Sequence, residues 1–308
     1  MRLVPAGTQI DFVGQSHVFA LLSLGVCLSV VLLIGVKGLN FGIDFAGGTV
    51  VQVAIPQASG AVDEGRLRSV VADAGFADSQ IVRYGAPEDR AFLISLPTSE
   101  EETKGLVPHV IDALSKALGA PVVPERIESI GPRVGVELRR AGVEALLLSW
   151  LLILVYLWFR FDVRYAPGAV VALIHDVLIT AGVFVLFGRE FNLQVLAALL
   201  VVIGYSLNDT IVIYDRIREN LGLRGATHLE EVVNMSINQT LSRTLLTSIT
   251  TLLVIVALLT LGGPVIQDFA LALLIGVTVG TYSTIYVASA LLIWIERRYG
   301  ASLKARAS

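Results

Sequence analysis

The sequence predicts a membrane all-α six-helix bundle, with one α+β domain inserted between the first and the second helix. Apolar residues make up 55% of the 308 residues and charged residues only 16%, whereas about 25% of a soluble domain is charged. Six apolar runs are long enough to cross a bilayer core of roughly 30 Å, which requires about 20 residues. Residues 40–140 hold 24 of the 49 charged residues, so they predict a domain in water.

The six predicted spans cover residues 18–36, 141–159, 165–187, 193–213, 241–261 and 269–295. We interpret the first as an uncleaved anchor, because the residues after it lack the small-residue pattern of a signal-peptide cleavage site. The chain therefore divides into residues 1–39 (N-terminus and first span), 40–140 (outer domain), 141–295 (spans two to six, with a loop at 214–240) and 296–308 (tail).

Lys and Arg residues in the short connections predict the orientation, because they collect on the cytoplasmic side. Ten fall on one side: Arg2, Arg160, Arg164, Arg216, Arg218, Arg224, Arg297, Arg298, Lys304 and Arg306. The short loops on the other side contain Arg189 alone. Both termini are therefore expected in the cytoplasm, and the outer domain on the opposite side.

The outer domain is predicted to have the element order βαββαβ, which is typical of a ferredoxin-like domain. Strand patterns cover residues 51–55, 81–84, 91–96 and 126–130, and Gly85 and Pro87 lie in the turn between the second and third. Helical spacing follows Leu67 and also follows the capping-box pair Ser99 and Glu102. Pro108 requires this second helix to start later or to kink.

Composition argues against several functions. Cys27 is the single cysteine, so no disulfide or redox pair is expected. The four histidines lack metal-ligand spacing, and no nucleophile-and-base set or phosphate loop occurs in the outer domain. The mildly acidic outer domain lacks the basic patch that nucleic acid requires. We expect no enzymatic activity, cofactor, metal or nucleic-acid partner, and a binding or mechanical role for the outer domain.

Charges within the spans indicate function, because each costs about 2.5–3.5 kcal/mol at the centre of a spanning helix. Asp209 follows Asn208 in the fourth span and shares a helix face with Tyr205. Arg243, near the start of the fifth span, is expected in the same cytoplasmic half of the bilayer, where the two charges can meet. Hydroxyl groups that can satisfy them or carry a proton are expected from Thr210, Thr240, Thr244 and Thr247.

Two interpretations of Asp209 and Arg243 remain open. They can form a static ion pair that fixes helix packing, with Arg243 extending towards the interface. Alternatively, the carboxyl loads and releases protons as its access to water changes. Moving one charge across the membrane potential releases about 2.3 kcal/mol per 100 mV, which is enough to bias a conformational equilibrium more than tenfold.

Other residues in the spans allow both polar packing and transport. His175 and Asp176 are adjacent in the third span and point about 100° apart, so they cannot both face one neighbour. They belong either to a proton route or to polar packing. Glu144, in the first turn of the second span, is expected at the interface, and the GxxxG pair Gly276 and Gly280 is expected to allow close helix packing.

The loop at residues 214–239 is predicted to form a short helix on the cytoplasmic membrane surface. Its first part is polar and basic, and Thr227 with Glu230 forms a capping pattern before apolar residues. The helix is expected to rest on lipid as a linker, or to touch a partner.

Four runs resemble the SecD/SecF family of bacterial protein-export subunits. They are GYSLNDTIVIYDRIREN at residues 204–220, FGIDFAGGT at 41–49 (with Asp44, Gly47 and Gly48), IGPRVG at 130–135 (with Gly131 and Pro132) and SINQTLSRT at 236–244. The Tyr-Ser-Leu-Asn-Asp order favours the SecF branch over SecD. The resemblance covers essentially the whole chain.

The resemblance implies a subunit that pairs with SecD into a twelve-span unit of the resistance-nodulation-division type in the bacterial inner membrane. Such a unit uses the proton-motive force to complete the export of unfolded preproteins, which reach the outer domain through the SecYEG channel. YajC/YidC-type proteins associated with the channel are further expected partners. Asp209 and Arg243 fall where the family places its proton-route charges. The rival functions are a proton-driven efflux subunit for lipids or drugs and a non-transporting scaffold of the channel.

Overall fold

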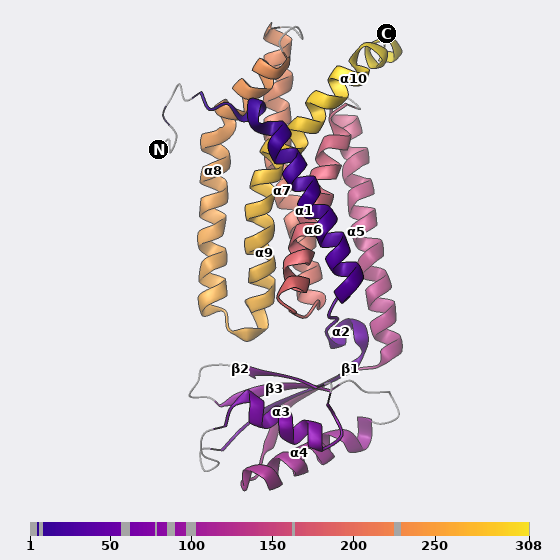
Figure 1. Ribbon diagram of the computed structural model, residues 1–308, viewed down its shortest axis with the longest axis vertical. Coiled ribbons are helices and arrows are strands. Elements are labelled where there is room, and N and C mark those ends of the chain that lie inside the picture. Colours follow the sequence, from indigo (N-terminus) through magenta and orange to yellow (C-terminus); the bar gives the residue numbers. More distant parts are fainter. Residues whose placement is uncertain are drawn as a thin grey trace.

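Apolar helices form a bundle at one end of the molecule, and a small α/β unit lies at the other end (Figure 1). The computed structural model describes residues 5, 9–56, 62–77, 79–84, 90–96, 103–161, 164–224 and 229–307. In this part of the chain six helices are long and apolar enough to cross a membrane. They comprise α1 (Phe12–Lys37), α5 (Pro132–Arg160), α6 (Ala166–Leu186), α7 (Leu193–Arg224), α8 (Leu229–Leu261) and a last helix made of α9 (Pro264–Ser283), the π-helical turn η3 (Thr284–Ala288) and α10 (Ser289–Ala307).

Helices α6, α7 and α9 form the interior of the bundle, whereas α1, α5 and α8 are peripheral. Small residues set the closest approach. A Cβ atom at Gly276 of α9 would lie 2.3 Å from Cγ2 of Val202 in α7, and one at Gly280 would lie 3.0 Å from Cβ of Ser206. The GxxxG pair therefore lies where α9 packs closest against α7.

The outer domain consists of α2 (Ile43–Ala46), β1 (Gly48–Ala54), α3 (Glu64–Asp73), β2 (Gln80–Tyr84), β3 (Ala91–Leu96), α4 (Thr103–Leu118) and β4 (Val123–Ile130). Its four strands form an antiparallel sheet of order β2-β3-β1-β4. Val51 of β1 faces Ile94 of β3 on one side and Ile127 of β4 on the other. The element order βαββαβ is the one predicted.

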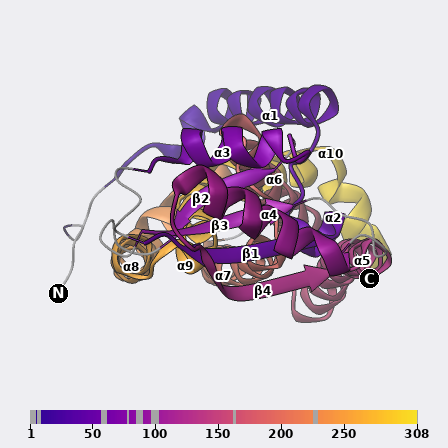
Figure 2. The ribbon, with the colours of Figure 1, turned by 90° about the horizontal axis from the view of Figure 1, so that it is seen from below.

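One face of the sheet is covered and the other faces the membrane bundle. Val51 and Ile94 are fully buried against Leu67 of α3 and Val110 of α4. Both helices lie on the side of the sheet away from the bundle (Figures 1 and 2). The opposite sheet face therefore lies close to the ends of the spanning helices, where it can take part in a site.

The sequence predictions need correction at several element boundaries. Helix α4 already begins at Thr103 and continues through Pro108, so the later start allowed for above does not occur. Strand β4 begins at Val123 rather than near residue 126. Gly85, Pro87, Ser99 and Glu102 lie outside the residues that the structure describes.

The predicted surface helix at residues 214–239 is wrong as a separate element. Helix α7 continues to Arg224, and the apolar residues after Glu230 belong to α8, which continues into the fifth span. Contacts between the two extensions explain this continuity, because Asn220 donates hydrogen bonds to Ser236 at 2.8 Å and to Gln239 at 3.0 Å. Thr227, the proposed cap, lies outside the described residues.

Candidate functional site

Asp209 is buried in the membrane bundle with part of its hydrogen-bonding capacity unused. Only 3% of the residue is exposed, and Oδ2 has no hydrogen-bond partner. A buried polar atom without a partner costs about 1–3 kcal/mol, and more when it is charged. This arrangement is unfavourable for a permanently ionised carboxylate, and protonation of Asp209 removes the charge. The side chain beside it, Asn208, is exposed.

Arg243 of α8 does not form a direct ion pair with Asp209. Among the described residues, neither a hydrogen bond nor a salt bridge joins the two, and the Arg243 side chain is exposed. Helices α7 and α8 nevertheless pack against each other, so the two residues lie on neighbouring helices. The structure therefore brings the two charged residues onto neighbouring helices without the direct contact that was expected.

Most of the hydroxyl groups that were predicted near these two charges already have partners. Thr240 and Thr247 donate to carbonyl oxygens of their own helix. Tyr205 Oη lies 3.5 Å from Ser248 Oγ, which in turn lies 2.8 Å from Thr281 Oγ1 of α9. Thr244 Oγ1 is buried without a partner, as Asp209 Oδ2 is. Thr244 is thus the predicted threonine that keeps a free hydroxyl.

Asp176 forms a second polar centre, and its carboxyl is well satisfied. The residue is completely buried. Ser206 of α7 and Ser283 of α9 donate to Oδ2 at 2.7 Å and 2.9 Å, and His175 Nδ1 lies 2.9 Å from Oδ1. Asp176 therefore joins the three interior helices, an arrangement suited to packing. Sequence analysis did not identify Ser206 and Ser283, because nothing in the spacing of α7 or α9 indicates which serines face α6.

His175 and Asp176 contact each other directly, although neighbouring positions on a helix usually diverge. The imidazole also stacks against Tyr282, with ring centroids 6.1 Å apart. Tyr282 in turn forms a hydrogen bond of 2.8 Å with Ser23 of α1. His175 Nε2 remains buried without a partner.

Helix α7 connects the two centres, because it carries both Ser206 and Asp209, which are three residues apart. Thr210 extends the contact with the last helix, since its Oγ1 lies 3.0 Å from Oγ1 of Thr284 in η3. A π-helical turn inside an α-helix often marks a functional region. A shift of α7 would therefore change the surroundings of both carboxyls.

The motif glycines hold the base of the outer domain against α5. Gly47 has a φ of +78°, and a Cβ there would lie 2.7 Å from Cα of Pro132, the first residue of α5. A Cβ at Gly48 would lie 2.7 Å from the carbonyl oxygen of Leu96. Gly131 caps α5 just before Pro132. The two runs therefore pack together where the chain enters and leaves the outer domain.

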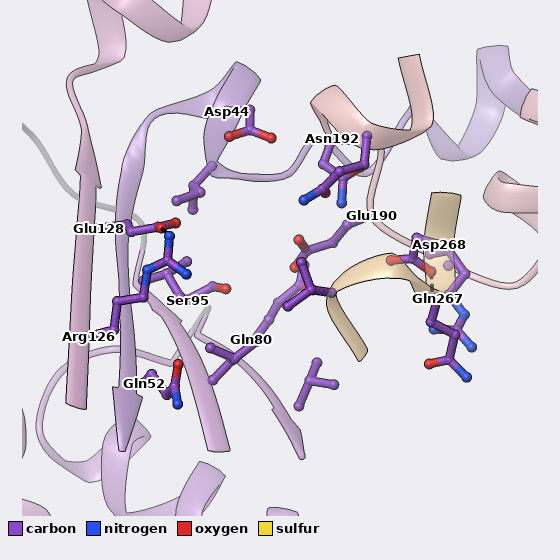
Figure 3. A pocket seen from close by; sticks show the side chains of 18 residues that line it. Asp44, Gln52, Gln80, Ser95, Arg126, Glu128, Glu190, Asn192, Gln267 and Asp268 are labelled. Atoms are coloured by element: carbon purple, nitrogen blue, oxygen red, sulfur yellow. Dashed lines mark hydrogen bonds and ion pairs between the residues drawn. The ribbon is translucent and has the colours of Figure 1, made fainter. Parts of the chain in front are cut away.

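A cleft of about 370 Å³ separates the open sheet face from the outer ends of α7 and α9 (Figure 3). Four carboxyl groups line it, those of Asp44, Glu128, Glu190 and Asp268, together with Arg126 and Arg189. Arg189 pairs with Asp268 at 3.3 Å. Burial raises the pKa of Glu190 above its ordinary value, and the nearby Asp268 and Asp44 carboxylates raise it further. Among the residues described, no three His, Cys, Asp or Glu residues form a metal-binding group.

Comparisons with known proteins assign the chain to a family. The family model for the C-terminal region of the protein export membrane proteins SecD and SecF matches residues 110–298, and the SecD/SecF GG-motif model matches residues 32–55. The chain belongs to the SecD/SecF family. The GG motif of this family corresponds to the end of α1, the segment around α2 and the whole of β1.

Relatives within the family carry the name protein translocase subunit SecF. The one from Desulfurispirillum indicum is 46% identical over 271 residues, which cover 86% of this chain and 85% of the relative. The one from Escherichia coli O157:H7 is 43% identical over 270 residues, which cover 86% and 81%. The chain is thus a SecF-type protein translocase subunit.

A solved structure with the same architecture is the translocon-associated membrane protein SecDF from Thermus thermophilus. It superimposes with a TM-score of 0.82 at 40% sequence identity, over 96% of this chain. SecDF in its super-membrane-facing form gives a TM-score of 0.73 at 40% identity, over 99% of this chain. This chain spans about 40% of those longer chains.

Proposed function

We propose that this subunit acts with a SecD-type partner and uses the proton-motive force to promote late steps of preprotein export. The observation that supports this proposal is Asp209, a buried carboxyl with an unpaired oxygen in a membrane-spanning helix of a translocase subunit. An ionisable residue inside a membrane helix is expensive and usually functional.

In the proposed cycle the charge of Asp209 sets the packing between α7 and α8. The ionised carboxylate is attracted by the Arg243 guanidinium of α8. Protonation removes this attraction together with the cost of the buried charge, so α7 and α8 can pack differently. One charge that crosses the membrane potential supplies about 2.3 kcal/mol per 100 mV, enough for a population shift of more than tenfold.

The proton route is assigned first to Asp209 and Arg243, with Asn208 and Tyr205 as polar neighbours. Asp176 and His175 are assigned a secondary part. The three interactions at the Asp176 carboxyl favour a packing role, whereas the unpaired His175 Nε2 leaves room for a proton. The proposed activity is transport and includes no enzymatic step.

The proposed location is the bacterial inner membrane, with both termini in the cytoplasm. The Lys and Arg bias of the short connections supports this orientation. It places the outer domain, ferredoxin-like in its element order, on the periplasmic side. There it would hold an unfolded preprotein that leaves the SecYEG channel, near YajC/YidC-type proteins.

The proposed partner surface is the side of the bundle formed by α7, α8 and α9. A groove of about 470 Å³ lies there, lined by residues such as Val201, Tyr205, Thr250 and Leu258. Apolar side chains of α8 are exposed nearby, including Leu253 at 65% and Val254 at 62%. The longer SecDF chains support a second bundle beside this one, in the paired arrangement of many transporters.

The substitution Asp209→Asn tests the proposal, because Asn keeps the size of the side chain and cannot carry the charge. We expect it to abolish the part of preprotein export that depends on the proton gradient while the complex still assembles. The control is Asp215→Asn, which changes an exposed aspartate of the same helix that pairs with Arg160 at 3.2 Å. Full export by Asp209→Asn would favour the scaffold function instead.

A further inference from the structure

Asp44 connects the base of the outer domain to a helix of the membrane bundle. It lies on α2, and its Oδ2 accepts a hydrogen bond of 2.9 Å from the backbone N–H of Leu193. Leu193 is the first residue of α7, so its N–H has no carbonyl partner within the helix. The contact joins residues that are 149 positions apart in the chain.

This contact is additional to the ordinary cap of α7. Asn192 Oδ1 already accepts a hydrogen bond of 2.9 Å from the N–H of Val195. A carboxylate at a helix N-terminus is favoured by the helix dipole as well as by the hydrogen bond. Asp44 therefore strengthens a junction between two parts of the molecule, since α7 has a cap without it.

Asp44 is held in a segment that also contacts a residue just before α7 through its backbone, since the N–H of Gly42 donates to the carbonyl oxygen of Phe191 at 3.1 Å. Its neighbour Phe45 is buried, and a Cβ at Gly135 of α5 would lie 3.0 Å from the Phe45 carbonyl. The Phe45 ring lies 6.3 Å from that of Phe191, just before α7. Strand β1 begins at Gly48, directly after α2. A displacement of Asp44 is therefore transmitted to β1, an interior strand of the sheet.

At its other end the contact leads to the proposed proton site. Helix α7 is continuous from Leu193 through Asp209, a separation of about 24 Å at 1.5 Å per residue. No proline interrupts it, and prolines are a common cause of sharp kinks. A shift of α7 at Asp209 thus reaches Leu193.

We propose that Asp44 couples the outer domain to the proton-driven movement of α7. The carboxylate keeps the base of the outer domain attached to the outer end of the helix that carries Asp209, so the two move together. This role rests on the proposed function above and deepens it, because it identifies a side chain that, beside the backbone hydrogen bonds of Asn40 and Gly42 with Phe191, lets the membrane part act on the domain that holds the client. Asp44 is a positioning residue and has no part in the proposed proton route.

Four variants test whether the hydrogen bond between Asp44 and Leu193 is itself required, rather than the general structure around it. Asp44→Ala removes the acceptor, whereas Asp44→Asn keeps an acceptor oxygen at a position where Asn caps about as well as Asp. Leu193→Pro removes the donor from the other side, and proline is favoured at the first position of a helix. The control Asp63→Ala removes the same kind of bond inside the outer domain, where Asp63 accepts from the N–H of Arg66 at 2.8 Å.

The functional measurement compares proton flux and preprotein export in membranes that contain the chain, its SecD-type partner and the channel. We expect Asp44→Ala and Leu193→Pro to keep the proton flux and to reduce the gradient-dependent part of export by roughly fivefold, the factor for one lost cap. Asp44→Asn and Asp63→Ala are expected to retain both.

A distance measurement supplies a readout that loss of activity alone does not give. Spin labels at Lys116→Cys in the outer domain and Leu261→Cys at the end of α8 use exposed positions. Cys27→Ser removes the native thiol. The distance distribution is expected to broaden in Asp44→Ala and Leu193→Pro, and to stay narrow in Asp44→Asn.

Two outcomes would overturn the coupling role. One is full gradient-dependent export by Asp44→Ala. The other is a loss of proton flux in Asp44→Ala while Asp63→Ala is normal, because Asp44 would then support the membrane site itself. Asp209→Asn is measured in parallel and reports on the proposed function alone. If it exports like the parent, the proton-driven function fails, whatever the Asp44 variants do.

Discussion

Ser206 donates a hydrogen bond of 2.7 Å to Asp176, and so joins helices α7 and α6 inside the membrane bundle. Ser283 of α9 reaches the same carboxyl oxygen at 2.9 Å. Ser206 also lies three residues before Asp209 on α7. The packing of the interior helices and the proposed proton site therefore depend on the same stretch of one helix.

The hydrogen bond at Ser206 predicts a measurable loss of stability. Ser206→Ala should lower the free energy of unfolding by about 0.5–1.5 kcal/mol, the range for a typical intramolecular hydrogen bond. Equilibrium unfolding in detergent measures this change. Ser149→Ala is the control, because Ser149 Oγ donates only to Ala145 O within α5. Equal stability of the two variants would show that the Asp176 centre contributes nothing to packing.

The close approach of α9 to α7 predicts that Gly276 does not tolerate a side chain. Gly276→Ala should destabilise the bundle by about 1–3 kcal/mol, the cost of overpacking a core, because its Cβ would lie 2.3 Å from Val202. In the matched variant Gly204→Ala a Cβ would meet no atom within 4 Å. There the gain in helix propensity, about 1 kcal/mol, should leave the thermal midpoint equal or raised.

The junction predicts different effects at two glycines with similar backbone angles. Gly38 and Gly47 have φ values of +73° and +78°, so alanine is strained at both. Only at Gly47 would the Cβ also collide with Pro132, whereas nothing lies within 4 Å at Gly38. Gly47→Ala should therefore lower the thermal midpoint more than Gly38→Ala does. The opposite order would contradict the proposed packing of the two motif runs.

The raised pKa of Glu190, which lies between the outer domain and the membrane bundle, predicts that the stability of the fold depends on pH. A carboxyl whose pKa is higher in the folded than in the unfolded protein destabilises the fold once it ionises, so this cost appears as the pH rises above the ordinary glutamate value. Glu190→Gln should raise the thermal midpoint at pH 7 and leave it unchanged at a pH below that value. Scans of both proteins at several pH values test this, and an equal difference at every pH would contradict it.

Much of the fold could be predicted because long apolar runs and short alternating runs are local signals. The start of α7 at Leu193 agrees with the predicted span, and β3 has the predicted bounds. The inner ends of α7 and α8 could not be predicted. Polar residues continue these helices beyond the apolar runs, and the bonds from Asn220 to Ser236 and Gln239 stabilise the extensions through tertiary contacts.

The candidate site was likewise predictable only where the signal lies in the local sequence. The cost of a charge in a span singled out Asp209, and the structure buries this residue. The partners of Asp176 are 30 and 107 positions away in the chain, and helix packing alone brings them together. The contact between Asp44 and Leu193 could not be predicted from the sequence, because a motif of glycines and apolar residues does not indicate which helix end lies nearby.

The entry and exit of the outer domain lie side by side, with Gly48 paired to Ile130 in the sheet. A domain that is attached at two adjacent points turns most easily about the line through them. A swing about this line would widen or narrow the cleft between the sheet and the outer ends of α7 and α9. The direction of such a swing is set by these two attachment points.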